Sequence, residues 1–340
     1  MIRTVCLFTL LLVSAPGTIA AAEPPERFLS PPSDPGPATV TVWFALHDIN
    51  EIGDEEETFG FNGVLRLTWK DPRQAFDPAA AGVAEKIYQG AFQVDEISPA
   101  WFPQVYLANE SGAFETDAVT LRIHPDGTSV LTSSIDAIAE TSLSMRRFPF
   151  DKQTLKAVFR IPGFSIDEVV FVGEGAEFDS QMEIPQWNLE GVGISVEAGP
   201  SPGFVLNVNV RRDPLFTLRL VGLPLALIVV LSWSVFWMER SSLGDRLSVS
   251  FVGILTAVAY QIVVGDLLPH VSYITLMHAF LNFSFLIMCA SVVANLVVGA
   301  CDRNGKVALG DLIDRRCRVL FPITYLGLLL AAAINAFFIL

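Results

Sequence analysis

Apolar residues fill four long stretches in the second half of the chain. They cover residues about 215–237, 246–268, 272–299 and 318–340. Each stretch is long enough to cross a hydrocarbon core about 30 Å thick as a helix, which rises about 1.5 Å per residue. The pattern therefore predicts an all-α transmembrane domain of four helices over residues 214–340.

Residues 23–213 have a different pattern, in which short runs of alternating apolar and polar residues are separated by Pro, Gly and Asp. The runs are VTVWFAL (40–46), GVLRLTW (63–69), VTLRIHP (119–125) and VLNVNV (205–210). Alternation of this kind is typical of strands with one buried face. Asp126-Gly127 predicts a hairpin between two runs, and the one helical pattern is short, near residues 79–88. The strand spacing predicts an all-β sandwich.

The first 22 residues resemble a cleaved secretory signal peptide. Arg3 gives a basic start, a short apolar stretch follows, and small residues surround Ala20 to Ala22. We therefore expect residues 1–22 to be removed and residues 23–213 to be exported.

Basic residues predict the orientation of the four helices. Arg240 and Arg246 lie at the connection of the first two stretches, Arg303, Lys306, Arg315, Arg316 and Arg318 lie at the connection of the last two, and the turn between the second and third holds only His270. The positive-inside rule places the two basic connections in the cytoplasm. We expect a multi-pass protein of the plasma (inner) membrane, with the β domain and the C-terminus on the extracellular or periplasmic side.

Composition excludes an ordinary soluble domain for the whole chain, because 51% of the residues are hydrophobic and only 17% are charged. The formal net charge is -14. Cys6 lies in the signal, and Cys289, Cys301 and Cys317 lie in or beside membrane stretches, so the exported domain is expected to lack disulfides and zinc. No catalytic triad order, metal cluster or phosphate loop is present. We expect no enzyme activity, cofactor, metal or nucleic-acid partner.

The second apolar stretch carries a polar stripe. Steps of three and four residues connect Asp245, Ser248, Val252, Leu255, Ala259, Ile262 and Asp266. Around a central axis, several copies would form rings with carboxylates at both mouths, hydroxyls at the inner constriction and apolar side chains between them, where dewetting can close a pore. The alternative is that both aspartates only mark wet helix ends.

Several motifs resemble those of one family. The strongest is RRFPFDKQTL (146–155), which contains Phe148, Pro149, Phe150 and Asp151. Others are Trp69 to Arg73, Trp101-Phe102-Pro103 with Leu107 and Asn109, Arg211 to Phe216, Pro224, and Leu268-Pro269 with Tyr273. Together they resemble the pentameric ligand-gated ion channels, the superfamily of nicotinic, glycine and GABA-A receptors. Thr141 and Leu155 replace the cysteines of the signature loop, and the last connection is only about 18 residues long, as in the bacterial branch.

The resemblance implies a homopentamer in which each chain has four identical subunits as partners and contributes an extracellular immunoglobulin-like sandwich. The second helix then lines the pore within the lipid bilayer. Asp245-Arg246 takes the place of the Glu-Lys pair of cation channels, with Arg246 pointing away from the axis. Five Asp245 side chains would concentrate monovalent cations. The alternatives are an anion-selective member and a membrane-anchored periplasmic binding or sensory receptor without conduction.

The resemblance also implies which residues transmit a signal to the pore. The coupling residues are Asp54, Glu55, Glu56, Phe148, Pro149, Phe150, Asp151, Arg211, Arg212, Pro269, His270 and Tyr273. The acidic loop IGDEEETF (52–59), which contains Asp54, Glu55 and Glu56, can pair with Arg211 or Arg212, and the sequence leaves the partner open.

The resemblance places an agonist site between subunits, where aromatic side chains can form a cation-binding cage. The corresponding residues here are Ala108, Asn109, Glu110, Arg160, Phe164 and Phe204. This set is poor in aromatics, and Arg160 can bind a carboxylate, so an amine and a carboxylate agonist both remain open. Phe164 can instead fill the core. Protons are a further candidate, with His270 as the sensor.

Overall fold

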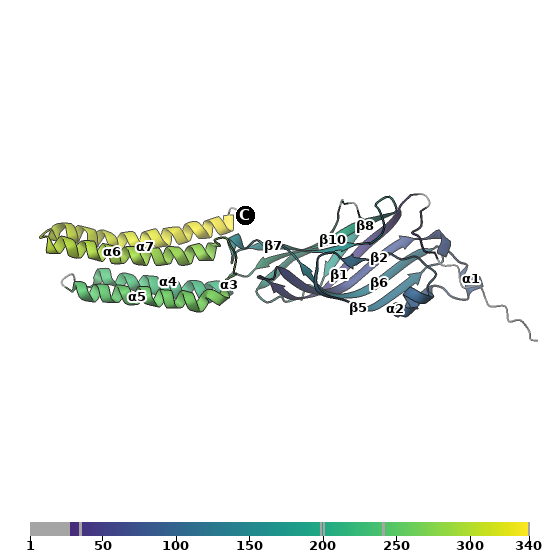
Figure 1. Ribbon diagram of the computed structural model, residues 1–340, viewed down its shortest axis with the longest axis horizontal. Coiled ribbons are helices and arrows are strands. Elements are labelled where there is room, and N and C mark those ends of the chain that lie inside the picture. Colours follow the sequence, from purple (N-terminus) through teal and green to yellow (C-terminus); the bar gives the residue numbers. More distant parts are fainter. Residues whose placement is uncertain (1–27, 34–35, 198, 200, 240–241, 339–340) are drawn as a thin grey trace, which may run out of the picture.

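The molecule is elongated, with a β domain at one end and a helical bundle at the other (Figure 1). The computed structural model describes residues 28–33, 36–197, 199, 201–239 and 242–338. The expected signal peptide, residues 1–22, lies outside the described residues. The chain passes from the β domain into the bundle where β10 (Gly203–Arg212) is followed by α3 (Leu215–Thr217).

The predicted β-sandwich is confirmed. One sheet has the strand order β3-β5-β6-β2-β1-β8 and the other has the order β4-β7-β10-β9. The remaining strand bounds are β1 (Ala38–Gly53), β2 (Thr58–Lys70), β3 (Lys86–Gln89), β4 (Tyr106–Leu107), β5 (Glu110–Ile123), β6 (Thr128–Glu140), β7 (Lys152–Arg160), β8 (Val169–Phe178) and β9 (Trp187–Val196). Neighbours run antiparallel except β1 and β8, which are parallel.

Alternation along the strands produces the core between the two sheets. In β2, Leu65, Leu67 and Trp69 are buried, while the residues between them face outward. The predicted hairpin joins β5 to β6, and Gly127 has φ 84°, a left-handed conformation that glycine adopts without strain. The Asp126 side chain accepts a hydrogen bond from the Thr128 amide at 3.0 Å and stabilises the turn.

The expected helix near residues 79–88 is right only at its start. Helix α1 (Pro78–Ala81) is capped by the Asp77 side chain and ends at Gly82, which has φ 68°. Residues 86–89 form a strand instead, and helical turns follow at α2 (Gly90–Phe92) and η2 (Gln93–Ile97). The remaining short turns of this domain are η1 (Pro72–Gln74) and η3 (Met145–Arg147).

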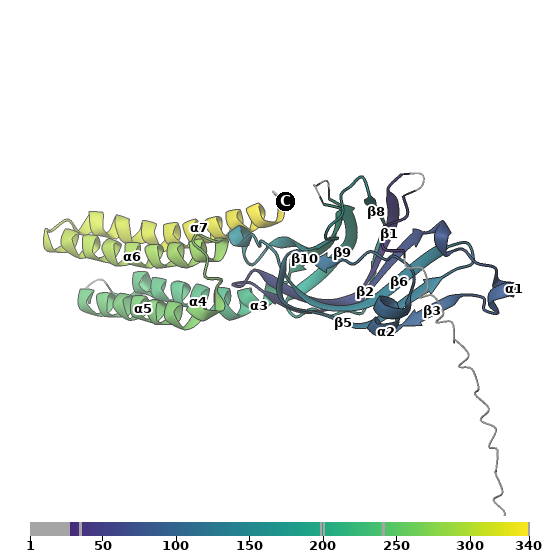
Figure 2. The same ribbon diagram turned by 45° about the vertical axis from the view of Figure 1, so that its right-hand side comes forward.

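The bundle contains two pairs of neighbouring helices, which both views separate clearly (Figures 1 and 2). The first apolar stretch comprises α3, η4 (Leu218–Gly222), α4 (Leu223–Ser232) and η5 (Trp233–Trp237); it is followed by α5 (Leu243–Val264), η6 (Gly265–Leu267), α6 (Leu276–Arg303) and α7 (Val307–Phe338). The wide π turn η4 immediately precedes Pro224, whose ring nitrogen has no proton to donate to the preceding turn.

Among the described residues, three helices are long and apolar enough to cross a membrane: Leu215–Trp237, Leu243–Leu267 and Leu276–Arg303. The fourth expected span, 318–340, lies on α7 and ends in residues outside the described part, so it stays a prediction.

Two expectations about the connections are wrong. The connection of about 18 residues between the last two spans is mostly helix, because α6 continues to Arg303 and α7 begins at Val307. Arg246 does not lie in a connection but inside α5, where it is buried. Arg240 lies outside the described residues. Both errors have one cause. Hydropathy identifies the part of a helix that can contact lipid, and a helix can continue beyond that part into polar residues.

Candidate functional site

Arg212 lies at the centre of a buried charge cluster where the β domain meets the bundle. Its guanidinium is 3.0 Å from Asp151 Oδ1 and 2.7 Å from Asp54 Oδ1. It also lies over two aromatic rings, 4.1 Å from the Trp187 centroid and 4.9 Å from the Phe148 centroid. Since the Arg212 side chain is only 4% exposed, these partners replace the water that the charge has lost.

The cluster joins three segments that are distant in sequence. Asp54 lies in the turn between β1 and β2, Asp151 lies just before β7, and Arg212 ends β10. The sequence left the partner of the acidic loop open between two arginines. The structure pairs Asp54 with Arg212, whereas Arg211 pairs with Glu190 at 3.3 Å on the surface.

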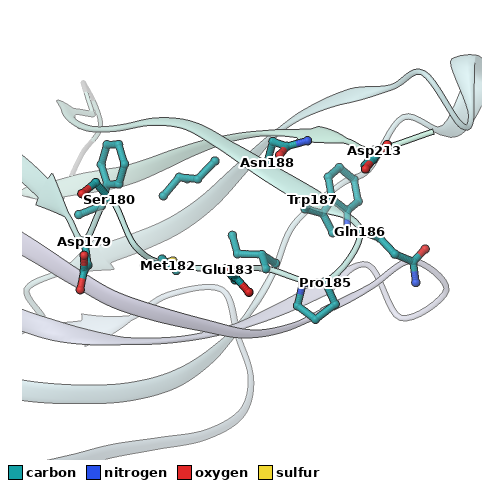
Figure 3. A pocket seen from close by; sticks show the side chains of 12 residues that line it. Asp179, Ser180, Met182, Glu183, Pro185, Gln186, Trp187, Asn188 and Asp213 are labelled. Carbon is teal, nitrogen blue, oxygen red and sulfur yellow. The ribbon is translucent and has the colours of Figure 1, made fainter. Parts of the chain in front are cut away.

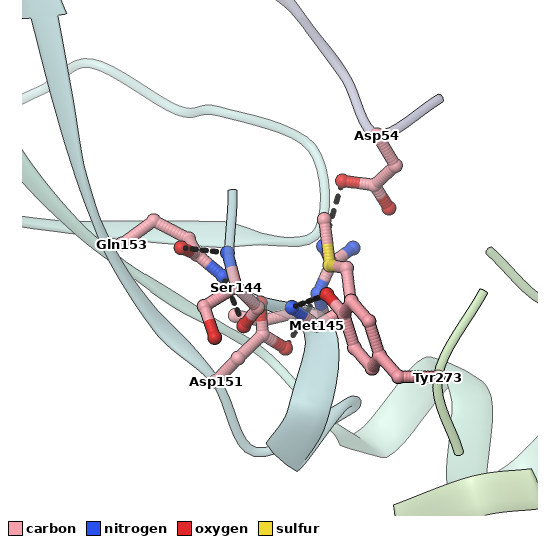
Figure 4. A network of polar contacts seen from close by, with 7 residues as sticks. Asp54, Ser144, Met145, Asp151, Gln153 and Tyr273 are labelled. Atoms are coloured by element: carbon pink, nitrogen blue, oxygen red, sulfur yellow. Dashed lines mark hydrogen bonds and ion pairs between the residues drawn. The ribbon is translucent and has the colours of Figure 1, made fainter. Parts of the chain in front are cut away.

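Side-chain hydrogen bonds close the loop that carries Asp151 (Figure 4). The Gln153 amide accepts from the Ser144 backbone N–H at 3.1 Å and donates to the Ser144 carbonyl at 3.0 Å. It also donates to Asp151 at 2.7 Å. Thr141 accepts from the Lys156 backbone at 3.2 Å. These hydrogen bonds close the base of the loop, whose other end carries Phe148 and Pro149.

This loop contacts the segment that leads into α6. The Tyr273 hydroxyl accepts a hydrogen bond from the Met145 backbone N–H at 2.8 Å (Figure 4). The Phe148 carbonyl accepts from the Met277 backbone N–H at 3.2 Å, one of the N–H groups that the start of a helix leaves without an intrahelical partner. Phe148-Pro149 is a cis peptide, and Phe150 is half-buried in the same loop.

A second connection joins the acidic turn to the segment before α6. His270 Nδ1 contacts the Glu55 carboxylate, and both side chains are exposed. The hydrogen bond that the Glu55 carboxylate accepts from the His270 ring, together with the Glu55 charge, raises the pKa of His270 above the ordinary value. Pro269 beside it is buried, and Glu56 is exposed. The acidic turn thus contacts Arg212 through Asp54 and the helical bundle through Glu55.

The predicted stripe lies on an uncovered face of α5. Asp245, Ser248, Val252, Leu255, Ala259, Ile262 and Asp266 are all exposed in the single subunit. Asp266 lies in η6 rather than in the α-helix, so the last step of the stripe follows a tighter turn. The opposite face is buried and consists of Arg246, Ser250, Ala257 and Val264.

Two predicted agonist residues belong to the framework of the sandwich. Phe204 is fully buried and stacks on Phe159 with 4.9 Å between ring centroids. The Asn109 amide donates to the backbone carbonyls of Glu140 at 2.6 Å and Lys156 at 2.7 Å. Their surroundings correct the expectation that these two side chains are available to a ligand.

The other predicted agonist residues lie at or near the surface. Ala108 and Glu110 are exposed, and Arg160 forms an ion pair with Glu197 at 2.6 Å. Phe164 packs edge-on against Trp101 at 5.9 Å and lines a hollow of about 270 Å³. Phe164 is therefore partly a packing residue.

A larger hollow of about 520 Å³ lies beside Trp187, one of the aromatic neighbours of Arg212 (Figure 3). It is lined mainly by the connection between β8 and β9, including Asp179, Met182 and Glu183, and by Trp187 and Asp213. Trp187 therefore lines this hollow and also packs on the Arg212 guanidinium. The sequence did not indicate Trp187, because its position opposite Arg212 depends on the register of β9 and β10.

Two family matches cover most of the chain. Residues 26–197 match the neurotransmitter-gated ion-channel ligand binding domain, and residues 222–308 match the neurotransmitter-gated ion-channel transmembrane region. The chain belongs to the pentameric ligand-gated ion channels. The β-sandwich of this channel subunit is therefore the extracellular ligand-binding domain, and its helices form the transmembrane region.

Similar proteins include bacterial and animal channels. The chain is 28% identical to the proton-gated ion channel of Gloeobacter violaceus over 308 residues, covering 87% of this chain and 82% of that protein. It is 24% identical to the human gamma-aminobutyric acid receptor subunit rho-2, covering 86% and 63%. It is 26% identical to the mouse gamma-aminobutyric acid receptor subunit theta, covering 70% and 38%. The channel subunit thus spans less than two thirds of these two animal relatives.

Proposed function

We propose that the chain forms a homopentameric, cation-selective channel of the plasma (inner) membrane, opened by a signal on the extracellular or periplasmic side. α5 of each subunit lines the pore, Asp245 and Asp266 form the rings at its two mouths, and the apolar level from Leu255 to Ile262 closes it. Monovalent cations are the permeant species.

One observation carries this proposal: the stripe residues are exposed together, while the opposite face of the same helix is buried. Val252, Leu255 and Ile262 are 63%, 70% and 75% exposed. An apolar face of this size with a carboxylate at each end fits an arrangement around a narrow aqueous path. The Arg246 charge is directed away from this face, so it does not cancel that of Asp245.

Ion flux tests the proposal. Purified protein in liposomes is expected to conduct, and its reversal potential in a salt gradient is expected to lie near the cation equilibrium potential. Asp245→Asn combined with Asp266→Asn should remove most of this preference, because both rings lose their charge. Unchanged cation preference in the double variant would reject the assignment of the rings. A wild type without flux would favour a receptor that does not conduct, and chloride preference would favour an anion channel.

Protons are the trigger favoured by a specific contact. His270 and Glu55 connect the β1–β2 turn to the segment before α6, and one of the similar proteins is a proton-gated channel. Protonation of His270 turns this contact into an ion pair, so acidification strengthens the connection between the two domains. A small carboxylate or amine at the subunit interface is the alternative agonist. A carboxylate would have to replace Glu197 on Arg160.

A further inference from the structure

A second buried charge cluster lies at the other end of the bundle. Arg246 of α5 is 1% exposed, and its guanidinium is 2.9 Å from Asp314 Oδ1 of α7. Asp314 is 2% exposed, and its Oδ2 atom accepts from Arg318 at 2.8 Å. One carboxylate therefore holds two guanidinium groups, one of which comes from the helix with the exposed stripe.

The two charges at the start of α5 face opposite surroundings. Asp245 and Arg246 are neighbours in sequence, and a helix turns by about 100° per residue. Asp245 is exposed on the stripe, while Arg246 is among the largest fully buried side chains of the molecule. Burial of an unpaired cation is strongly unfavourable, so the orientation of Arg246 requires Asp314.

Packing at this end leaves α5 little freedom to turn. A side chain at Gly299 of α6 would collide with Leu243, which shows that α5 starts directly against the end of α6. If Arg246 lost its partner, its long side chain could reach water only by leaving the interior at the mouth of the bundle, close to Asp245.

We propose that Asp314 is a specificity-determining positioning residue, which holds Arg246 inside the bundle and thereby preserves the negative ring of Asp245 at the pore mouth. The inference rests on the proposed cation pore. A residue of α7 would then influence the charge selectivity of the pore, although α7 contributes no residue to the stripe. Loss of Asp314 releases a positive charge near each Asp245, so the permeability to cations relative to anions falls.

The test measures permeability ratios in planar bilayers with an asymmetric KCl gradient. All channels carry Leu255→Ser, which makes the proposed apolar closure of the pore polar, so current is expected without an agonist. Asp314→Asn is expected to move the reversal potential toward the chloride equilibrium potential. Arg246→Gln/Asp314→Asn, which removes both charges of the pair, should restore the parent value. Asp311→Asn removes an exposed carboxylate of the same helix and is the control for loss of a negative charge; its shift should be smaller than that of Asp314→Asn.

A measurement without conduction accompanies the first. Thermal unfolding of the detergent-purified proteins should show a lower Tm for Asp314→Asn and recovery in the double variant, since the pair is coupled. The inference is overturned if Asp314→Asn has the parent's permeability ratio, or if the double variant shows no coupling in Tm. Asp245→Asn on the same background distinguishes the two hypotheses. If it leaves the permeability ratio unchanged, the proposed ring of Asp245 is rejected. If it changes the ratio and Asp314→Asn does not, only the role of Asp314 is rejected.

Discussion

Arg212 shows how a single side chain can hold three loops in place. Asp54 comes from the β1–β2 turn, Asp151 and Phe148 come from the loop before β7, and Trp187 begins β9. Water does not compete for the guanidinium because it is buried. How much each partner contributes to the free energy of unfolding depends on how deeply the ion pair is buried, because an exposed ion pair contributes little.

Asp151→Asn is expected to lower the free energy of unfolding by about 1.5–3 kcal/mol, the range for losing a hydrogen bond to a charged group, because Asp54 still compensates the charge of Arg212. The measurement is denaturation of the detergent-purified protein. Glu190→Gln is the matched control, because Glu190 pairs with Arg211 and Lys152 on the surface, and it should cost less than about 1 kcal/mol. Equal effects of the two substitutions would contradict the role given to burial.

The contact of Glu55 with His270 predicts a pH dependence. Glu55 raises the pKa of His270, so the stabilising contact is fully present below the ordinary pKa of histidine and is lost as the pH rises through the raised value. Glu55→Gln removes the main cause, and the pKa of His270, followed by NMR, should fall. If protons open the channel, the pH of half-maximal current should become more acidic. Glu56→Gln is the control, and a shift of equal size there would contradict the specific contact.

Close strand packing makes one glycine of β2 irreplaceable. A Cβ atom at Gly63 would lie 2.7 Å from the Phe44 ring and closer still to the Ala45 carbonyl oxygen, whereas at Gly60 of the same strand the nearest atom is 3.6 Å away. Gly63→Ala should therefore destabilise the β domain by about 1–3 kcal/mol through overpacking, and Gly60→Ala should have little effect. Comparison of the two Tm values checks this, and a stable Gly63→Ala protein would show that β1 and β2 can separate without cost.

Strands with a clear alternation of apolar and polar residues were predictable from sequence, whereas other elements depended on contacts with neighbouring elements. The runs within β1, β2, β5 and β10 and the Asp126-Gly127 hairpin follow from local alternation and turn chemistry. The short strand β3 has no such alternation and forms because β5 offers it an edge. The polar first turns of α7 were assigned to a loop, although Asp314 within them is buried against Arg246. Tertiary contacts decide such segments, and local pattern does not contain them.

For the whole molecule, sequence motifs indicated which loops lie at the junction of the two domains, but not which side chains pair there. Asp54 and Arg212 were both candidates, and only the folded chain selects this pair over Arg211. The agonist candidates were less successful: Phe204 was indicated by position in the chain, but β10 directs it into the core. The direction of a side chain depends on strand register, which a resemblance of motifs does not provide.

The exposed apolar stripe predicts the assembly state. Leu255 and Ile262 are largely exposed in one subunit, and the proposed arrangement directs them toward a common axis. Light scattering coupled to size exclusion in detergent should therefore give a protein mass of five subunits. A monomer or a tetramer would contradict the proposed ring.

The loop that presses on the bundle is closed by the Gln153 amide and the Thr141 hydroxyl, where animal receptors of this family have a disulfide. An amide is insensitive to oxidants and reductants, so this loop closes without the formation or rearrangement of a disulfide. The contact of this loop with the helices should consequently be the same in a reducing and in an oxidising medium.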